Sequence, residues 1–480
     1  MKIKSGSLIL FALLILLIHL NLVFSLKYII IPFKVQKFDY KEDKHGLLHN
    51  YLYKDIIVNL PFGTPKQVVP LLAGMGEYST YIVSNDASDL EGAKFDKKLS
   101  NTYYTSEVVN EIYSYQTFSE AFPSRDTIHL ENPEIQIKDY EFFLVTKIGK
   151  NICYLPYCEI LTQPGVLGFR MSESQTYHED MNNTNLIVQF KNKEIIDNYD
   201  FNFFFETPEK GAIIIGQKPH EYDNAHYKKD NFIFTKVAID NEKEKDWSLN
   251  FNKIYFGDDE MASDKNMLLR VEYGLINGNR KWQEILEKNF FNDLIEQKKC
   301  FKGKGYNDGH SYFHYYCNKD TNISEFKQFD FINDDLNFNI TLTKDDLFIE
   351  DDNKLLFLII FGHPQPILGY PVFKKYQFIF NQDTNTIGLY STINGIPTIP
   401  ESLPSSRFGK EETKKGDSMN FIIGILFLII FVLCILALRK YYKDLKKKER
   451  KRLLNELNPD SGVQLMDYEK IEKIKSEKNS

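Results

Sequence analysis

The sequence predicts a mainly β body of two or three domains, followed by one membrane-spanning helix near the C-terminus. With 480 residues, the chain is too long for a single hydrophobic core. Its 38 Phe and 29 Tyr favour strands, and Gly and Pro punctuate its apolar, β-branched runs. Residues 421–438 contain no charged residue and are long enough to cross a bilayer of ~30 Å.

Both ends of the chain carry patterns related to membranes. In residues 1–25, Lys2 and Lys4 precede an apolar run from Leu8 to Ile18, and Ser25 offers a small residue for cleavage. This is typical of a secretory signal peptide, with an uncleaved anchor as the alternative. The predicted transmembrane helix covers residues 419–438, and the basic residues after it place residues 439–480 in the cytosol. We therefore expect a single-pass membrane protein whose body is lumenal or extracellular, at the cell surface or in the endo-lysosomal system.

Charge and residue spacing argue against nucleic-acid binding and against a zinc site. The net charge of −7 divides into +5 after Leu438 and −12 before it, and so acidic a body argues against nucleic-acid binding. No CxxC or His-rich spacing indicates a zinc site. We expect no metal and no cofactor.

The cysteines and sequons fit an oxidising, glycosylating compartment. Four of the five cysteines lie outside the predicted span in two close pairs, which favours two local disulfides, although four cysteines allow three connectivities. These four are Cys153, Cys158, Cys300 and Cys317. Three sequons are candidate glycosylation sites: Asn182, Asn322 and Asn339.

The stretch from Ile56 to Ser84 predicts two strands around the turn Phe62-Gly63-Thr64-Pro65. It resembles the opening of the pepsin-like family of aspartic proteases, where a strand ends in G-T-P-x-Q and a second strand ends in the catalytic D-T-G-S. In that family the catalytic Asp comes seven residues after the turn's Gln. Here the seventh residue after Gln67 is Gly74. The frame of the motif is present, but its carboxylate is absent.

Three further motifs resemble the first lobe of this family. The strand that ends at Tyr115 resembles the one leading into the flap, so Tyr115 matches the flap tyrosine; the alternative is an ordinary strand aromatic. The segment Pro164–Phe169 resembles D-G-I-L-G-L, whose glycines let a strand pass close beneath the active site. The segments at 201–205 and 212–216 resemble the family's F-S-F-x-L … G-x-L-x-F-G hairpin.

The second half of the chain repeats this pattern. The segments starting at Trp247 and ending at Gly257 resemble the strands before the second catalytic motif. The motif itself falls on residues 269–275, where Glu272 takes the position of the second Asp. A helix is expected next, because apolar residues recur at helical spacing between Ile285 and Ile295. The segment Ile367–Phe373 resembles the family's closing I-L-G-D motif.

The resemblance implies a bilobal pepsin-like fold, with two β-barrel-like lobes and a cleft between them. We assign residues 51–219 to the N-lobe and 220–391 to the C-lobe. Residues 26–50 are an N-terminal extension whose apolar alternation fits an outer strand, or else a short propeptide. Residues 392–418 are a stalk rich in Pro, Ser and charge.

Aspartic proteolysis needs two carboxylates that share one proton, so that one activates a water while the other donates to the substrate. At the dyad-equivalent positions, Gly74 supplies no carboxylate and Glu272 supplies one that is displaced by a methylene. A displacement of about an ångström can cost about a hundredfold in rate. A new pair with Glu77 would need a three-residue shift that breaks the spacing from Gln67. We therefore expect an inactive site.

Three functions remain open after this argument. The favoured one is a membrane-anchored pseudopeptidase whose cleft binds an extended peptide or protein by β-augmentation. The second is an active aspartic endopeptidase that uses an atypical carboxylate pair. The third is a receptor-like protein in which the fold is only a scaffold.

The tail carries two patterns that resemble endocytic sorting signals read by clathrin adaptors. One is an acidic dileucine and the other a tyrosine-based signal, formed by Glu449, Leu453 and Leu454, and by Tyr468 and Ile471. The alternative is a basic amphipathic stretch held at anionic lipid by its Lys and Arg cluster.

Overall fold

The computed structural model divides the chain into two compact units, residues 1–407 and 408–480, which are described separately below. It describes residues 28–36, 48–52, 54–87, 94–105, 110–114, 117–131, 134–148, 165–171, 184–238, 246–307, 310–397, 439, 442–450 and 452. Within these ranges no helix combines the length and apolarity needed to span a membrane. The predicted signal peptide and the predicted span at 419–438 lie outside them.

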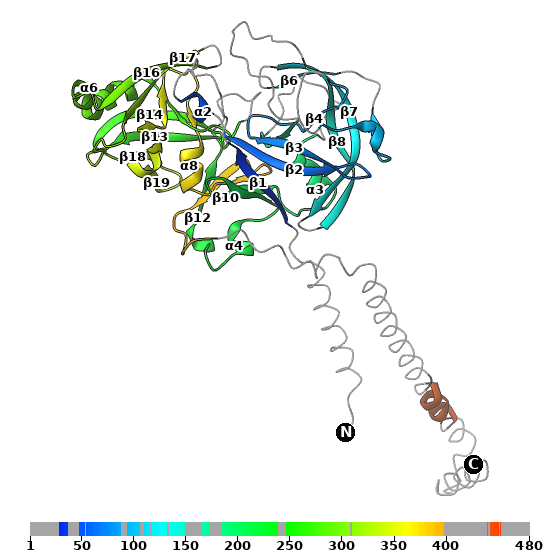
Figure 1. Cartoon of the computed structure of the whole chain (residues 1–480). Coiled ribbons are helices and arrows are strands. Elements are labelled where there is room, and N and C mark those ends of the chain that lie inside the picture. The colour runs from blue at the N-terminus through cyan, green and yellow to red at the C-terminus, as the bar shows by residue number, and fades with distance from the viewer. Residues whose placement is uncertain are drawn as a thin grey trace. The chain divides into compact units, whose positions relative to one another are not determined.

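The first unit contains two sheets (Figure 1). The larger sheet runs in the order β12-β25-β24-β10-β11-β1-β2-β3-β9-β4-β8-β7-β5, with β6 paired to β7. Its described strands are β1 (Ile29–Gln36), β2 (Asp55–Phe62), β3 (Gln67–Gly74), β4 (Tyr81–Val83), β5 (Tyr104–Thr105), β6 (Asn110–Ser114), β7 (Thr117–Glu131), β8 (Glu134–Ile148), β9 (Gly165–Gly168), β10 (Asp200–Thr207), β11 (Lys210–Ile215), β12 (Phe232–Lys236), β24 (Ile379–Asn381) and β25 (Thr386–Tyr390).

The second sheet is built from the second half of the chain, in the order β19-β18-β13-β14-β23-β15-β22-β17-β21-β20, with β16 paired to β17. Its described strands are β13 (Ser248–Phe256), β14 (Asp259–Leu269), β15 (Ile276–Gly278), β16 (Cys300–Asn307), β17 (His310–Asn318), β18 (Phe329–Asn333), β19 (Phe338–Leu342), β20 (Phe348–Asp351), β21 (Lys354–Phe357), β22 (Ile359–Phe361) and β23 (Ile367–Leu368).

Short helices pack around the two sheets. They are α2 (His49–Leu52), α3 (Leu186–Asn192), α4 (Pro219–Tyr222), α5 (Arg280–Leu286), α6 (Asn292–Glu296), α7 (Lys344–Leu347) and α8 (Tyr370–Lys375), with 3-10 turns η2 (Lys97–Leu99) and η3 (Lys229–Asn231) and the π-helical turn η4 (Glu287–Phe291). The continuous run α5–η4–α6 confirms the helix predicted from apolar spacing. Leu286 and Phe290 are buried on it, and Ile285, Leu294 and Ile295 pack against the same core.

The extension before residue 51 is part of the fold. Its strand β1 lies between β11 and β2, with Phe33 opposite both Gly211 and Val58. Ile29 and Ile31 pack into the main core, whereas Ile30 joins a cluster on the other face. Because β1 pairs with a strand on each of its two edges, it is an inner strand of the sheet rather than an outer one.

Helix α2 belongs to the packing of the second sheet although it precedes the first-lobe strands in sequence. Leu48, Tyr51 and Leu52 form a buried cluster with residues of the second half of the chain, including Tyr273 and Leu275. Figure 1 shows this dark blue helix beside the green and yellow strands. The position of α2 matters for the site, because it brings the start of the chain to the Glu272 loop.

The hairpin β16–β17 carries the described disulfide. Cys300 and Cys317 face each other directly across the two strands and are bonded, as predicted. The other predicted pair, Cys153 and Cys158, lies outside the described residues.

Removing this disulfide should destabilise the protein measurably. The bridge closes a loop with a sequence separation of 17 residues, for which loss of the cross-link costs roughly 3 kcal/mol. We expect the double variant Cys300→Ser/Cys317→Ser to unfold at clearly lower urea concentration than the wild type, with folding intact at low urea. An unchanged urea midpoint would show that the bridge contributes nothing to stability.

Candidate active site

Gly74 and Glu272 stand on two loops that the fold builds in the same way. Strand β3 ends at Gly74 and pairs in parallel with β9, and β14 pairs in parallel with β23 before the chain turns towards Glu272. The Gly74 carbonyl accepts a hydrogen bond from the Phe169 N–H at 2.9 Å, and the Leu368 carbonyl accepts one from the Arg270 N–H at 3.1 Å. A short parallel strand therefore fixes each loop.

Each loop also rests on a glycine that leaves no room for a side chain. A Cβ atom on Gly168 would lie 2.5 Å from the Tyr78 carbonyl carbon, and one on Gly369 would lie 2.2 Å from the Tyr273 carbonyl oxygen. Because the neighbours are backbone atoms, they cannot rotate away. The close approach predicted for the Pro164–Phe169 motif is thus present at Gly168, and Gly369 plays the same part beneath the second loop.

The carboxylate of Glu272 crosses to the first loop. Its Oε2 accepts a hydrogen bond from the Met75 N–H at 3.1 Å, and its Oε1 accepts one from the Gly76 N–H at 2.9 Å. The residue is only 5 % exposed. The structure thus brings Glu272 to the residues directly after Gly74, so the two dyad-equivalent positions meet. This meeting point supplies one carboxylate from residue 272 and none from residue 74.

The N-terminal segment supports the Glu272 loop from the other side. The Glu272 carbonyl accepts a hydrogen bond from the Lys54 N–H, and the Leu52 carbonyl accepts one from the Gly274 N–H, both at 2.8 Å. A Cβ atom on Gly274 would lie 2.0 Å from the Tyr51 carbonyl oxygen. This contact was not predicted from the sequence, because no pattern in residues 48–54 indicates that they pack against a loop more than 200 residues away.

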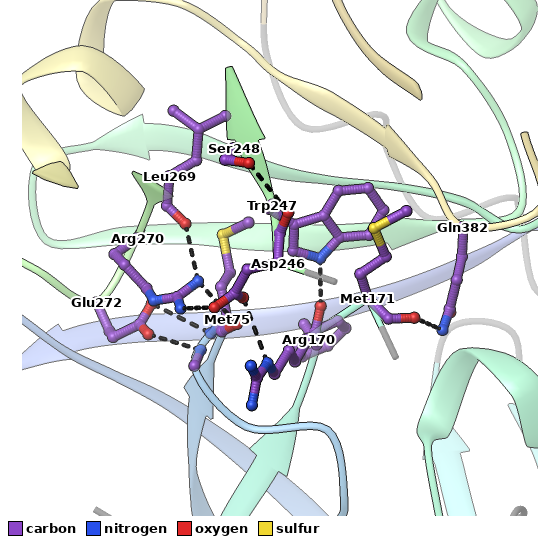
Figure 2. A network of polar contacts seen from close by, with 12 residues as sticks. Met75, Arg170, Met171, Asp246, Trp247, Ser248, Leu269, Arg270, Glu272 and Gln382 are labelled. Atoms are coloured by element: carbon purple, nitrogen blue, oxygen red, sulfur yellow. Dashed lines mark hydrogen bonds and ion pairs between the residues drawn. The ribbon is translucent and has the colours of Figure 1, made fainter. Parts of the chain in front are cut away.

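Three charged residues surround this point and tie the two halves of the chain together (Figure 2). Arg270 donates to the Asp246 carboxylate at 2.6 Å and to the Met75 carbonyl at 3.2 Å. Arg170 contacts the other Asp246 oxygen at 3.4 Å. Asp246 therefore lies between two guanidinium groups.

Sequence reasoning did not select these three residues for the site. One signal was available for Arg270, since a charged residue stands in the otherwise apolar end of a strand, Leu269-Arg270-Val271. Asp246 directly precedes the motif that starts at Trp247, and Arg170 directly follows the Pro164–Phe169 motif. Nothing local in the sequence indicates that these two residues meet.

The surroundings of Glu272 act on its pKa in opposite directions. Burial raises the pKa of the carboxyl above its ordinary value of 4.5, because the charged form loses water. The positive charge of Arg270 and the N–H groups of Met75 and Gly76 lower it in part. The pKa remains raised overall, so protonation begins at a higher pH than for an exposed glutamate.

Most other predicted site residues lie away from this point or outside the described ranges. The hairpin β6–β7 is present and pairs Ser114 with Thr117, but Tyr115 between them is not described. Glu77 is half-buried, and its carbonyl accepts a hydrogen bond from the Arg170 N–H. Asn322 and Asn339 are exposed, and Glu449 is exposed on a helix of the second unit. Asn182, Leu453, Leu454, Tyr468 and Ile471 lie outside the described residues.

Over the described ranges, no group of three or more His, Cys, Asp or Glu residues could hold an ion.

The raised pKa of Glu272 predicts a pH-dependent effect of the substitution Glu272→Gln. A carboxyl whose pKa rises on folding stabilises the folded state below its ordinary pKa, and this contribution is lost as pH rises through the raised pKa. The neutral amide of Gln does not titrate. We expect the Tm of Glu272→Gln relative to wild type to increase as pH rises from about 4.5, measured by calorimetry at several pH values.

The substitution Glu287→Gln is a control, because the pKa shift of Glu287 has the opposite direction to that of Glu272. Although burial acts to raise the pKa of Glu287, hydrogen bonds from Lys302 and Tyr315 lower it overall. Its charged form therefore stabilises the folded state above the ordinary pKa. The Tm of Glu287→Gln should lie below that of the wild type at neutral pH, and this difference in Tm should shrink as pH falls. Parallel pH curves for the two variants would contradict the assignment of a raised pKa to Glu272.

Comparison with known proteins agrees with the arrangement of these loops. The family model described as eukaryotic aspartyl protease matches residues 56–392, a range that contains both loops and nearly every described strand. Among curated proteins, none matches the chain. Because the family match covers well over half of the 480 residues, the chain belongs to the eukaryotic aspartyl protease family.

Proposed function

We propose that this chain is a membrane-anchored, catalytically inactive member of its family, and that its interlobe cleft binds an extended peptide or protein segment. The observation that carries the proposal is the position of the Glu272 carboxylate on the Met75 and Gly76 N–H groups. Those N–H groups belong to the loop that a first catalytic carboxylate would occupy.

An Asp at position 74 could itself accept a hydrogen bond from the N–H two residues ahead, as Asp side chains do in tight turns. In this chain that donor, the Gly76 N–H, is bonded to Glu272 from the other half of the chain. The Glu272 carboxylate thus accepts the hydrogen bonds that the Met75 and Gly76 N–H groups of the first loop donate. This supports a structural role for Glu272, which holds the two loops together.

The charge beside Glu272 also disfavours acid–base catalysis. In a catalytic dyad, two carboxylates share a proton because both cannot ionise at close range. The charged group that acts on Glu272 is the guanidinium of Arg270, which stays positive and stabilises the ionised carboxylate. Asp246 is already paired to Arg270 and Arg170. Neither acid therefore has the environment of a shared-proton pair.

A binding role draws support from the strand pairing near the predicted flap. Among the described strands, β6 pairs with β7 alone, and an extended peptide could add as a further strand at its other edge. An extended peptide added along such an edge gains main-chain hydrogen bonds whatever its side chains. The family fold would thus be retained as a peptide-binding frame.

The membrane anchor rests on the sequence. Residues 419–438 contain no charged residue, and a run of basic residues begins directly after them at Arg439. Together with the predicted signal peptide, they would hold the body on the lumenal or extracellular side. The sorting signals proposed for the tail would act from the cytosol.

The inactive assignment predicts no peptide-bond cleavage by the purified protein. We expect no turnover of denatured protein substrates between roughly pH 3 and 6, where a shared-proton dyad works, and no tight binding of a statine-type inhibitor. Cooperative thermal unfolding in the same buffers verifies that the sample is folded. Statine-sensitive turnover that disappears in Glu272→Ala would favour the active endopeptidase with an atypical carboxylate pair instead.

The binding role is tested separately by amide hydrogen exchange. A peptide selected from a random display library against the protein should slow exchange in β6, residues 110–114, because its backbone would bond to that edge. A selected peptide that protects a distant surface and leaves β6 unchanged would favour the scaffold function.

A further inference from the structure

The second unit contains a strongly basic helix that the proposed function does not use. Residues 442–450 are helical and exposed, and they are drawn in orange-red in Figure 1. In the sequence, residues 439–452 contain nine Lys or Arg and only two acids. The helix begins a few residues after the apolar run that ends at Leu438.

The basic residues of this helix form a stripe. Since a helix turns by about 100° per residue, four of them fall within an arc of about 100°. These four are Lys443, Lys446, Lys447 and Arg450, which we call the basic stripe. The two acids, Asp444 and Glu449, lie on either side, each about 110° from the centre of the stripe. One face is thus purely cationic, and the acids point elsewhere.

A one-sided stripe suits a helix that lies along a charged surface. If the helix continued straight away from the bilayer, Arg450 would lie about 18 Å beyond Leu438, at ~1.5 Å per residue. That exceeds the Debye length of about 8 Å at physiological ionic strength, so its charge would be screened from the membrane. A helix lying along the surface instead keeps the whole stripe within reach of the headgroups.

We infer that the basic stripe binds anionic phospholipid headgroups of the cytoplasmic leaflet and lays the helix along the membrane. The inference rests on the proposed membrane anchor, which places the helix at that leaflet. Clusters of four to eight Lys or Arg next to a transmembrane helix attract acidic lipids, with a gain of roughly fivefold in binding for each cation. An acidic soluble protein is the competing occupant.

The test uses the full chain incorporated into lipid nanodiscs and a protease that cleaves after Glu449. This residue is exposed on the helix, so cleavage reports whether the helix is free. In nanodiscs with about 30 % phosphatidylserine, we expect cleavage to be at least tenfold slower than in neutral phosphatidylcholine nanodiscs. Salt at about 0.5 M should restore fast cleavage, because it screens exposed charges.

Two neighbouring lysines provide matched variants. Lys447→Gln removes a charge from the stripe, whereas Lys448→Gln removes the same charge about 150° from its centre. Gln has nearly the same helix propensity as Lys, so both variants keep the helix. We expect Lys447→Gln to weaken docking about fivefold and Lys448→Gln to change it by less than twofold. Replacing all four stripe residues by Gln should abolish protection.

Three results would overturn the inference. Equal cleavage rates in neutral and anionic nanodiscs would exclude lipid and favour an acidic soluble protein. Equal effects of Lys447→Gln and Lys448→Gln would show that net charge, rather than the stripe, attracts the membrane. A chain that fails to incorporate and is extracted from vesicles by carbonate would refute the anchor and the inference together. An incorporated but unprotected chain refutes the inference alone.

Discussion

The buried carboxylate of Glu272 is the constraint on which the arrangement of the site depends. A carboxylate removed from water costs several kcal/mol unless other groups replace its solvation. Here the N–H groups of Met75 and Gly76 and the charge of Arg270 replace part of that solvation, and the pKa of Glu272 stays raised. Arg270 in turn bonds to Asp246, which also contacts Arg170. Arg270 therefore links Glu272 to Asp246, and replacing Arg270 by a neutral residue would deprive both acids of this cation.

The frame around this set does not depend on charge. The loops are fixed by short parallel strands and by backbone contacts at Gly168 and Gly369, where no side chain fits. Neither device involves the side chain at position 74 or 272. A chain can therefore keep the fold of its family while the residues at the centre of the two motifs change. Backbone contacts fix the loops, whereas the side chains at positions 74 and 272 determine the chemistry.

Sequence patterns predicted the local parts of this fold and missed the long-range ones. The hairpin β10–β11 and the helical run from Arg280 follow from turn residues and apolar spacing, which act over a few residues. The segments that start at Trp247 and end at Gly257 were expected as two strands, but they form the single strand β13. The placement of β1 inside the sheet and of α2 against the second half depends on partners far along the chain. The same is true of the contact between Arg170 and Asp246. The proximity of Gly74 and Glu272 could be predicted only because both halves of the chain carry family motifs in the same order.

The charges of the site and of the C-terminal helix differ in how solvent acts on them. Arg270 and Asp246 are mostly covered, with side chains 13 % and 16 % exposed, so salt screens their attraction weakly. Proton uptake changes the charge of Glu272 beside them. The basic stripe is exposed, so salt screens its charges more strongly. Ionic strength therefore controls the stripe, while pH controls the site.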